Sequence, residues 1–412
     1  MTQAWSRRCF LASTAVMPCL AAKRVLGAND RIRIGVIGVG NRSGLLIDQL
    51  PQQAEVVAVA DCFLRRCNEA AGKRQATWRI YQDYRRLLEQ KDIDGVIVGT
   101  PDHARVLACI RACQAGKDIY AEKPLTLFVE EGRTLVKAVH RYERVFQAGS
   151  QQRSMAMNRM ACDFVRNGGL GAIKLVQCVN YTGPKRYTPM PEEPAPDTLD
   201  WNMWLGQTAK RPYNGSLHKS WMTWWDYSGG EMTNWGAHGL DQVQWALGMD
   251  GTGPIEWWPA EDGPEGSIGF RYANGVTVRL DQPAGRLEGG ALFTGEKGKI
   301  EIIRNNFRTD PPRMIKELPP PSEVQKWRDE VALWQAKYHM ENWLDCMRTR
   351  SKPLADVEIG HRSVSLGHLA NITRQLGRKL VWDPERERFK DDNEANGLLA
   401  RKPRKGFELP KV

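Results

Sequence analysis

A glycine-rich turn near the start of the chain constrains the fold more than any other feature. A short run rich in isoleucine and valine leads into Gly38, Gly40 and Ser43, which occupy the three key positions of a G-x-G-x-x-G pattern. The first glycine permits a tight turn, the second lets the backbone approach a pyrophosphate, and the third position needs only a small residue. The following helix would offer unpaired N–H groups to phosphate. The pattern predicts a dinucleotide-binding turn, with Asn41 and Arg42 as further candidate contacts.

An acidic residue follows the next strand pattern at the distance expected for ribose binding. Residues 55–60 read as a strand that ends at Asp61, 23 residues after Gly38. An acid at this place binds the adenosine ribose hydroxyls and would repel the 2′-phosphate of NADP, so we expect NAD. Arg65 and Arg66 keep NADP possible. The alternative is that Asp61 only caps the next helix.

Strand and helix patterns alternate up to residue 150, which predicts a doubly wound parallel sheet of the Rossmann type. Two of the predicted strands, residues 94–99 and 118–121, end in the polar motifs T-P-D-H and E-K-P. Ligands bind at the carboxyl ends of such strands. The candidate cofactor contacts at this edge are Thr100, Pro101, His103, Glu122 and Lys123. For His103, shaping the loop is the alternative.

The rest of the chain predicts an α+β second domain. Short alternating strands are expected at residues 255–258, 267–272, 276–281, 291–294 and 299–303, and they favour a mainly antiparallel sheet. We expect a homo-oligomer through the outer face of this sheet. The expected organisation is a signal peptide (1–28), a dinucleotide-binding domain (29–150), a substrate and oligomerisation domain (151–382) and a polar tail (383–412). The tail is either a surface strap or partly disordered.

With these motifs the chain resembles the Gfo/Idh/MocA family of oxidoreductases, which includes glucose–fructose oxidoreductase and inositol dehydrogenase. The resemblance rests on G-V-I-G-V-G-N-R-S-G, T-P-D-H, E-K-P and W-G-A-H in the expected order, and it covers nearly everything after the predicted signal. It implies a nicotinamide cofactor and oxidation of a sugar, glycoside or polyol hydroxyl.

The resemblance also implies two catalytic residues, Lys123 of E-K-P and His238 of W-G-A-H. The family's aspartate of D-x-x-x-H is Asn234 in this sequence. Oxidation of an alcohol needs a base beside the hydroxyl, for which a histidine is suited near neutral pH. A lysine near the nicotinamide would orient the hydroxyl or steady an alkoxide. Asn234 cannot act as a base but can bind substrate. A surface lysine and a structural histidine are the alternatives.

Three further residues are candidates for substrate binding: Trp235, Asp241 and Arg153. Asp241, one turn after the histidine, either orients it or caps the helix. Arg153 either anchors substrate or forms a structural salt bridge. Aromatic faces stack on sugar rings, although core filling is expected for about half of the fifteen tryptophans. Six of them precede or enter the histidine helix: Trp201, Trp204, Trp221, Trp224, Trp225 and Trp235.

The N-terminus reads as an export signal. Residues 6–11 are S-R-R-C-F-L, and an apolar run continues to Ala22, which is typical of the twin-arginine pathway. A frayed tail is the alternative, and cleavage after Ala22, Gly27 or Ala28 is compatible with the pattern. Because this pathway exports folded proteins, a periplasmic dehydrogenase would have to hold its cofactor tightly and regenerate it in place.

Composition excludes several other classes. The net charge of +11 comes from scattered basic residues, so no nucleic-acid surface is expected. The sequence contains no run of 18 apolar residues, so no membrane-spanning helix is expected. The nine cysteines include no C-x-x-C pair, which is the spacing typical of a zinc site. We therefore expect no bound metal.

The leading hypothesis is therefore an exported NAD(P)-dependent oxidoreductase with a small carbohydrate substrate. The second is a NAD-dependent glycoside hydrolase that uses transient oxidation and elimination. The third is a sugar-binding pseudoenzyme, favoured by Asn234 but opposed by Lys123 and His238.

Overall fold

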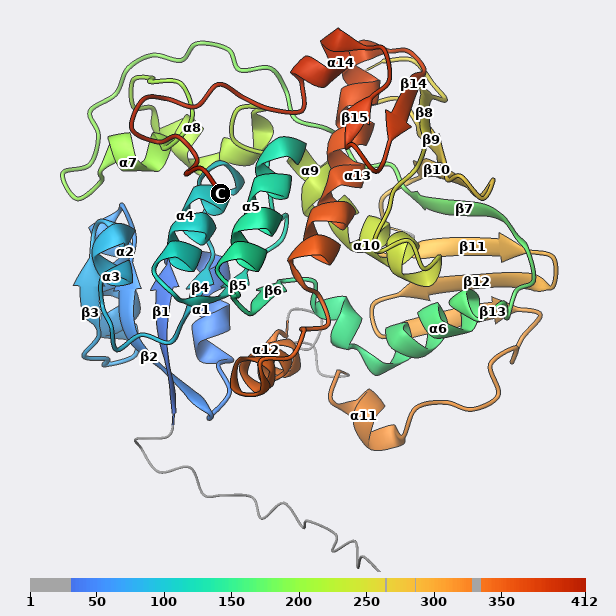
Figure 1. Cartoon of the computed structure of the whole chain (residues 1–412), viewed down its shortest axis with the longest axis horizontal. Helices are drawn as coiled ribbons and strands as arrows, with labels where there is room; N and C mark the ends of the chain where they lie inside the picture. Colours follow the sequence, from blue (N-terminus) through green and yellow to red (C-terminus); the bar gives the residue numbers. More distant parts are fainter. Residues whose placement is uncertain (1–30, 264, 286, 328–334) are drawn as a thin grey trace, which may run out of the picture.

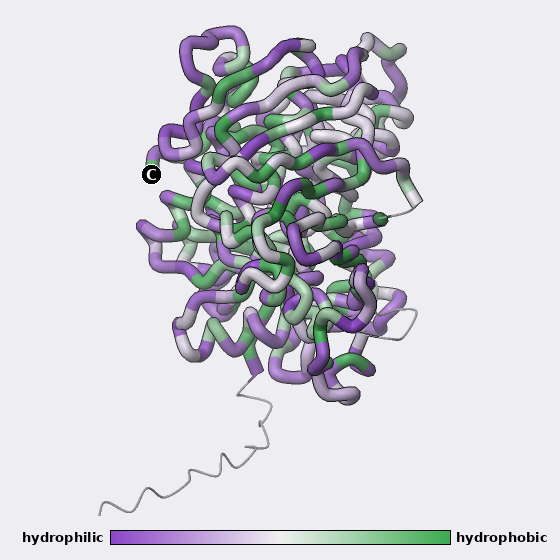
Figure 2. The backbone as a smooth tube through the Cα atoms, turned by 90° about the vertical axis from the view of Figure 1, so that its right-hand side faces the viewer, coloured by the Kyte–Doolittle hydropathy of each residue, from purple (hydrophilic) through white to green (hydrophobic). Residues whose placement is uncertain are grey.

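The computed structural model describes residues 31–412 except 264, 286 and 328–334. These residues form a six-stranded and a nine-stranded sheet, each flanked by helices (Figure 1). The predicted signal peptide, residues 1–28, lies outside the described residues. Hydrophilic segments follow the outer loops, while hydrophobic stretches run through the interior (Figure 2). Within the described part of the chain, no helix has the length and apolar character needed to cross a bilayer.

The first sheet is parallel and has the order β3-β2-β1-β4-β5-β6. Its strands are β1 (Ile32–Ile37), β2 (Ala54–Ala60), β3 (Arg79–Tyr81), β4 (Gly95–Val98), β5 (Asp118–Ala121) and β6 (Phe146–Ala148). The connecting helices are α1 (Asn41–Asp48), α2 (Leu64–Lys73), α3 (Tyr84–Leu88), α4 (Asp102–Gln114) and α5 (Val129–Arg141). β4 is buried along its whole length because helices cover both faces of the sheet. The strand order changes direction between β1 and β4, and doubly wound sheets bind their ligands at this point.

The second sheet has the order β13-β12-β11-β7-β10-β9-β8-β14-β15. Its strands are β7 (Ile173–Val179), β8 (Glu256–Pro259), β9 (Ile268–Arg271), β10 (Thr277–Gln282), β11 (Ala291–Gly295), β12 (Gly298–Ile303), β13 (Asn306–Asp310), β14 (Leu380–Asp383) and β15 (Arg388–Phe389). The pair β7–β10 is parallel, whereas the other pairs are antiparallel. The sheet is thus mixed but mainly antiparallel, which confirms the predicted fold class.

Helices cover one face of this sheet, and some of them also contact the first domain. They are α6 (Ala156–Arg166), α9 (Gly230–Asn234), α10 (Gly236–Ala246) and α13 (Val357–Leu376), with the 3-10 turn η2 (Gln151–Ser154) before α6. Leu240 and Val243 of α10 share one hydrophobic core with Val278 and Leu280 of β10. The remaining short helices are α7 (Trp201–Leu205), α8 (Gly215–Lys219), η3 (Trp221–Thr223), α11 (Pro321–Gln325) and α14 (Asn393–Gly397).

The C-terminal part of the chain returns to the first domain. α12 (Lys337–Thr349) contributes Trp343 to a core that also contains Ile34 and Tyr120 of the parallel sheet. The segment after β15 then crosses the molecule, where Arg401 Nη2 donates to His103 O at 2.6 Å. The predicted polar tail, residues 383–412, is therefore a surface strap only in its last part: Asp383 and Arg388–Phe389 belong to the nine-stranded sheet, and Phe389, Ala395 and Leu399 are buried in its core. The boundary expected at residue 383 was wrong because these few apolar residues are separated by charged ones.

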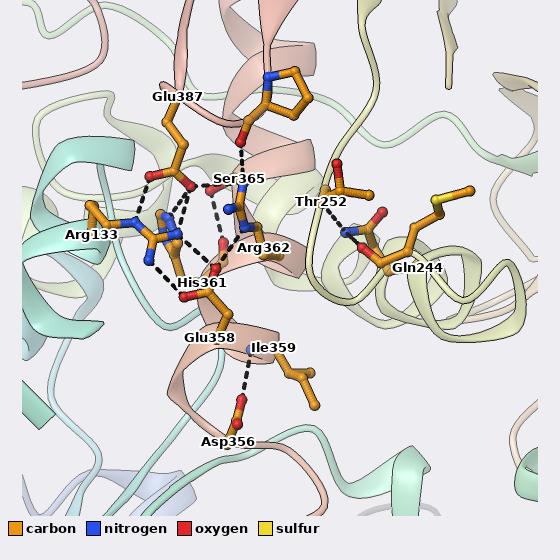
Figure 3. Close-up of polar contacts among 12 residues, drawn as sticks. Arg133, Gln244, Thr252, Asp356, Glu358, Ile359, His361, Arg362, Ser365 and Glu387 are labelled. Carbon is orange, nitrogen blue, oxygen red and sulfur yellow. Dashed lines mark hydrogen bonds and ion pairs between the residues drawn. The ribbon is translucent and has the colours of Figure 1, made fainter. Parts of the chain in front are cut away.

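A cluster of charged side chains joins the turn between β14 and β15 to α5 and α13 (Figure 3). Arg133 of α5 donates to Glu358 of α13 and to Glu387 after β14, with both shortest distances at 2.7 Å. His361 Nε2 lies 2.7 Å from Glu387 Oε1. Burial raises the pKa of Glu358, but its bonds with Arg133 and Arg362 outweigh this and hold that pKa at about 2. The cluster holds the orientation of α13 relative to α5.

Candidate active site

The glycine-rich turn has the backbone geometry that a pyrophosphate needs. Gly38 has a φ of +82°, and a Cβ atom there would lie 2.8 Å from Thr100 N, so only glycine fits. A Cβ atom at Gly40 would meet nothing within 4 Å among the described residues, which leaves this side of the turn open. Ser43 Oγ donates to Gly38 O at 2.5 Å and closes the turn from within. Asn41 is the first residue of α1, so its N–H group belongs to the helix N-terminus that would face phosphate.

Asp61 connects the turn to the second strand. Its Oδ2 accepts a hydrogen bond from Val39 N at 2.7 Å, and its Oδ1 accepts one from Phe63 N at 2.8 Å. Asp61 Oδ1 also accepts from Cys62 Sγ at 3.7 Å. The carboxylate is thereby fixed at the end of β2, and Oδ2 retains a lone pair for a ribose hydroxyl. The guanidinium carbons of Arg65 and Arg66 lie 4.7 Å and 5.8 Å from the centroid of the Phe63 ring. The arginines that keep NADP possible therefore pack beside Phe63.

The T-P-D-H motif forms the start of α4. Pro101 is its N-cap, and the Thr100 hydroxyl is buried with no hydrogen-bond partner among the described residues. An orphaned hydroxyl at this edge fits a bound polar group. Asp102 Oδ2 accepts from Ser228 Oγ at 2.9 Å, and Ser228 Oγ accepts from Gly230 N at 3.1 Å. Asp102 thus positions the start of α9 in the second domain.

His103 is fully buried, and its Nε2 lies 2.7 Å from the carbonyl oxygen of Trp204. Burial lowers the pKa of His103 to about 3, so the ring is neutral. Its ring contacts those of Trp204 and Tyr227, with centroids 4.9 Å and 5.0 Å away. These contacts support the loop-shaping alternative, and a cofactor contact by His103 stays a prediction.

Lys123 lies at the end of β5 and reaches across to α9. Its Nζ donates to Asn234 Oδ1 at 2.9 Å and to Asn234 O at 3.1 Å. The neighbouring Glu122 accepts from Arg42 Nε at 2.8 Å, which ties the glycine turn to E-K-P. Burial lowers the pKa of Lys123 to about 8, although the charge of Glu122 opposes this. Lys123 can therefore exchange a proton near physiological pH.

His238 is the third residue of α10 and is buried, with 7% of its surface exposed. Its ring centroid lies 6.1 Å from that of Trp235. Burial holds the pKa of His238 well below its ordinary value, and the positive charges of Lys123, Arg304 and Arg42 lower it further. The imidazole is therefore neutral and a weak base. The charge of Lys123 acts on His238, so the two predicted residues lie in the same region, and their catalytic roles stay a prediction.

Arg153 and Asp241 belong to a buried ion-pair cluster. Arg153 Nε lies 2.9 Å from Asp241 Oδ2, and Arg153 Nη2 lies 2.7 Å from Asp250 Oδ1. Asp241 also accepts from Ser363 Oγ at 2.6 Å. Because Arg153 is only 3% exposed, these contacts support the structural salt bridge for it. Asp241 is 2% exposed and is the sixth residue of α10, so the prediction that it caps this helix was wrong. Substrate contacts by these two residues stay a prediction.

The tryptophans differ in their surroundings: some pack in a hydrophobic core, and Trp235 lies near the predicted site residues. Trp201 and Trp204 stack at 4.4 Å and pack with Tyr227 in a small core that includes Phe63 of the first domain. Trp235 instead lies beside His238, and the guanidinium carbon of Arg304 lies 4.8 Å from the centroid of its ring. A substrate contact by Trp235 stays a prediction.

Two residues near the site were missed by sequence reasoning. Glu231 accepts from Asn234 Nδ2 at 3.0 Å, and its spacing of three residues in one helix was visible in the sequence. Arg304 follows β12, about seventy residues after Trp235, and no local pattern indicates that the two meet. Long-range contacts of this kind become visible only in the fold.

Comparisons with known proteins agree with this geometry. The Gfo/Idh/MocA model described as "Oxidoreductase family, NAD-binding Rossmann fold" matches residues 32–150, and that of the "C-terminal alpha/beta domain" matches 179–409. Inositol 2-dehydrogenase 3 of Saccharopolyspora erythraea is 35% identical over 38% of this chain and 47% of its own length. Rhizopine catabolism protein MocA of Rhizobium meliloti is 25% identical over 54% of this chain and 59% of its own. The chain spans about half the length of the curated relatives it matches.

Solved structures share the fold at low identity. The WlbA dehydrogenase from Bordetella pertussis, in complex with NADH and UDP-GlcNAcA, aligns with a TM-score of 0.61 at 20% identity, over 86% of this chain and 99% of its own. The scyllo-inositol dehydrogenase from Lactobacillus casei, with NAD(H) and scyllo-inositol, gives 0.59 at 15% identity, over 85% and 99%. This likeness shows the two-domain fold.

Proposed function

Because the chain belongs to the Gfo/Idh/MocA oxidoreductase family, we propose that it is a NAD-dependent dehydrogenase acting on a sugar, glycoside or polyol hydroxyl. The observation that carries the proposal is the contact of Lys123 with Asn234 across the two domains. It supports the proposal because an amine with a pKa of about 8, close enough to a neutral histidine to act on its charge, lies at the end of β5, on the sheet edge where Gly38 and Asp61 would hold the dinucleotide.

Oxidation of an alcohol removes a hydride from carbon and a proton from oxygen. NAD, when bound, supplies the hydride acceptor. Lys123 Nζ accepts the hydroxyl proton in its neutral form. His238 stays neutral and orients the same hydroxyl by a hydrogen bond, and Asn234 binds the substrate or the lysine through its amide. Trp235 provides an apolar face for the carbohydrate ring.

The same proposal includes tight retention of the cofactor. Residues 198–200 of the second domain lie directly on the loop after Asp61: Leu64 N donates to Thr198 O at 3.0 Å, and Asp200 N donates to Cys62 O at 2.8 Å. Phe63 packs into the tryptophan core behind this loop. The loop beside the expected ribose position is thus covered by another segment, which supports slow exchange of the dinucleotide.

The test is to purify the protein without added nicotinamide, identify the released cofactor by mass, and add sugars and polyols to the untreated protein. We expect bound NAD, and reduction of it by at least one carbohydrate, read as the near-ultraviolet absorbance of reduced nicotinamide. Protein that carries and binds no nicotinamide, or bound NAD that no carbohydrate reduces, would contradict the proposal.

A redox-neutral glycoside hydrolase is the second candidate, and the covered loop after Asp61 favours it as well, because the cofactor would never need to leave. A ring hydroxyl would be oxidised, the aglycone eliminated, water added, and the ketone reduced by the same bound NADH. Release of free sugar from a glycoside without net change in the cofactor would identify this reaction; net accumulation of a ketone product would identify the dehydrogenase.

We also propose export to the periplasm by the twin-arginine pathway, on the basis of residues 6–22 of the sequence. We further propose that the protein forms a homo-oligomer through the outer face of the nine-stranded sheet. Exposed Lys174 and Arg279 lie on β7 and β10 of that sheet, so charge reversal at these positions should weaken self-association in sedimentation experiments.

A further inference from the structure

Asn234 lies between a lysine and a glutamate. Its side-chain oxygen accepts from Lys123 Nζ at 2.9 Å, and its side-chain nitrogen donates to Glu231 Oε2 at 3.0 Å. Glu231 and Asn234 are three residues apart in α9, so their side chains share one face of that helix. A continuous hydrogen-bonded chain therefore runs from Glu231 through the amide to Lys123.

The two ends of an amide are not equivalent. Its oxygen only accepts hydrogen bonds and its nitrogen only donates them, while an ammonium group has donors alone. If the Asn234 amide were turned over, its NH₂ group would face Lys123 and two donors would meet. An ionised carboxylate at Glu231 accepts only, so it selects the orientation in which the amide oxygen faces Lys123.

We propose that Glu231 is a positioning residue: its carboxylate fixes the Asn234 amide, and the fixed amide holds Lys123 Nζ at the edge of the cofactor site. The catalytic consequence rests on the proposed function, whereas the orientation of Lys123 does not. The carboxylate that the sequence lacks at position 234 is thus present one helical turn earlier, and it acts through a neutral amide instead of touching the lysine.

Several charged or titratable groups act on Lys123 from the surrounding elements. They are Glu122 at the end of β5, Arg42 in α1, Asp102 in α4, Arg304 after β12 and His238 in α10. None of them provides the two oxygens that Asn234 presents to Nζ, at 2.9 Å and 3.1 Å. The loss of the amide oxygen should therefore be visible at Lys123 even with these groups unchanged.

The competing role for Glu231 is that of an acid in the first turn of α9, where its charge would favour the helix dipole. Two substitutions separate the roles. Glu231→Met removes both charge and acceptor, whereas Glu231→Gln removes the charge but keeps an oxygen that can accept from Asn234 Nδ2. Glu130→Met is a matched control, because Glu130 is an exposed first-turn glutamate of α5.

The experiment measures acylation of Lys123 by an amine-reactive ester as a function of pH, quantified by peptide mass spectrometry on protein with its cofactor content checked. In Glu231→Met we expect the labelling midpoint to fall by about one pH unit, because the charged amine loses a hydrogen bond. Glu231→Gln should restore the wild-type midpoint, and Glu130→Met should leave it unchanged.

A wild-type midpoint in a folded Glu231→Met protein would overturn the proposal, as would an equal shift in Glu231→Gln. If Glu231→Met does not fold, Glu231→Ala provides the variant without an acceptor. Labelling needs no turnover, so the expected shifts in a protein that oxidises no carbohydrate would contradict the proposed function alone.

Discussion

The rate of hydride transfer should depend on pH through Lys123. Burial lowers the pKa of Lys123 to about 8, and only the neutral amine can accept the hydroxyl proton. The neutral fraction is then about one tenth at pH 7 and about nine tenths at pH 9. We therefore expect the single-turnover rate to rise about tenfold between these two pH values and to level off above them.

The assay is rapid mixing of the holoenzyme with its substrate, followed by the absorbance of the bound nicotinamide from pH 6 to pH 10. Lys123→Met should remove the rise and lower the plateau by about 10²–10⁴. His238→Gln should lower the rate but keep the rise, because the pKa of His238 lies well below its ordinary value. A step near pH 6.5 that disappears in His238→Gln would refute this reasoning and make His238 the proton acceptor.

Three further predictions concern the cofactor, the fold and export. Asp61→Asn should raise the affinity for NADP relative to NAD in a binding titration, because the carboxylate no longer repels a 2′-phosphate; an unchanged ratio would show that Asp61 only fixes the turn. Arg153→Met should lower the free energy of unfolding by about 3–5 kcal/mol in urea, since Asp241 stays buried without its cation. Replacement of Arg7 and Arg8 by lysine should retain the protein in the cytosol on fractionation, and normal export would exclude the twin-arginine pathway.

Local patterns predicted the elements that depend on local sequence. The helix α13 is such an element, because apolar residues recur along Val357–Leu376 and Asp356 caps its start. The glycine turn was predictable because the turn requires a positive φ at residue 38, and glycine adopts that φ without strain. β13 and β15 were missed because one is polar at alternate positions and the other has two residues.

Only those site residues that belong to recognisable motifs could be proposed from the sequence. Lys123 and His238 were proposed from their motifs, yet the protonation state of His238 depends on burial and on the charges of Lys123, Arg304 and Arg42, which come from distant parts of the chain. Arg153 was left open between two roles, and its partner Asp250, almost one hundred residues away, provides the contact that separates them. Burial and long-range charge are properties of the folded chain, and sequence spacing does not contain them.

The most direct test of the account is to follow the hydride itself. Holoenzyme is mixed with a carbohydrate that carries deuterium on the carbon of the reactive hydroxyl. The cofactor is then extracted, and its mass is measured by mass spectrometry. We expect NADH with one deuterium from the wild-type protein, and far less of it from Lys123→Met in the same time. Unlabelled cofactor from the wild-type protein, with every carbohydrate that it binds, would contradict the central claim.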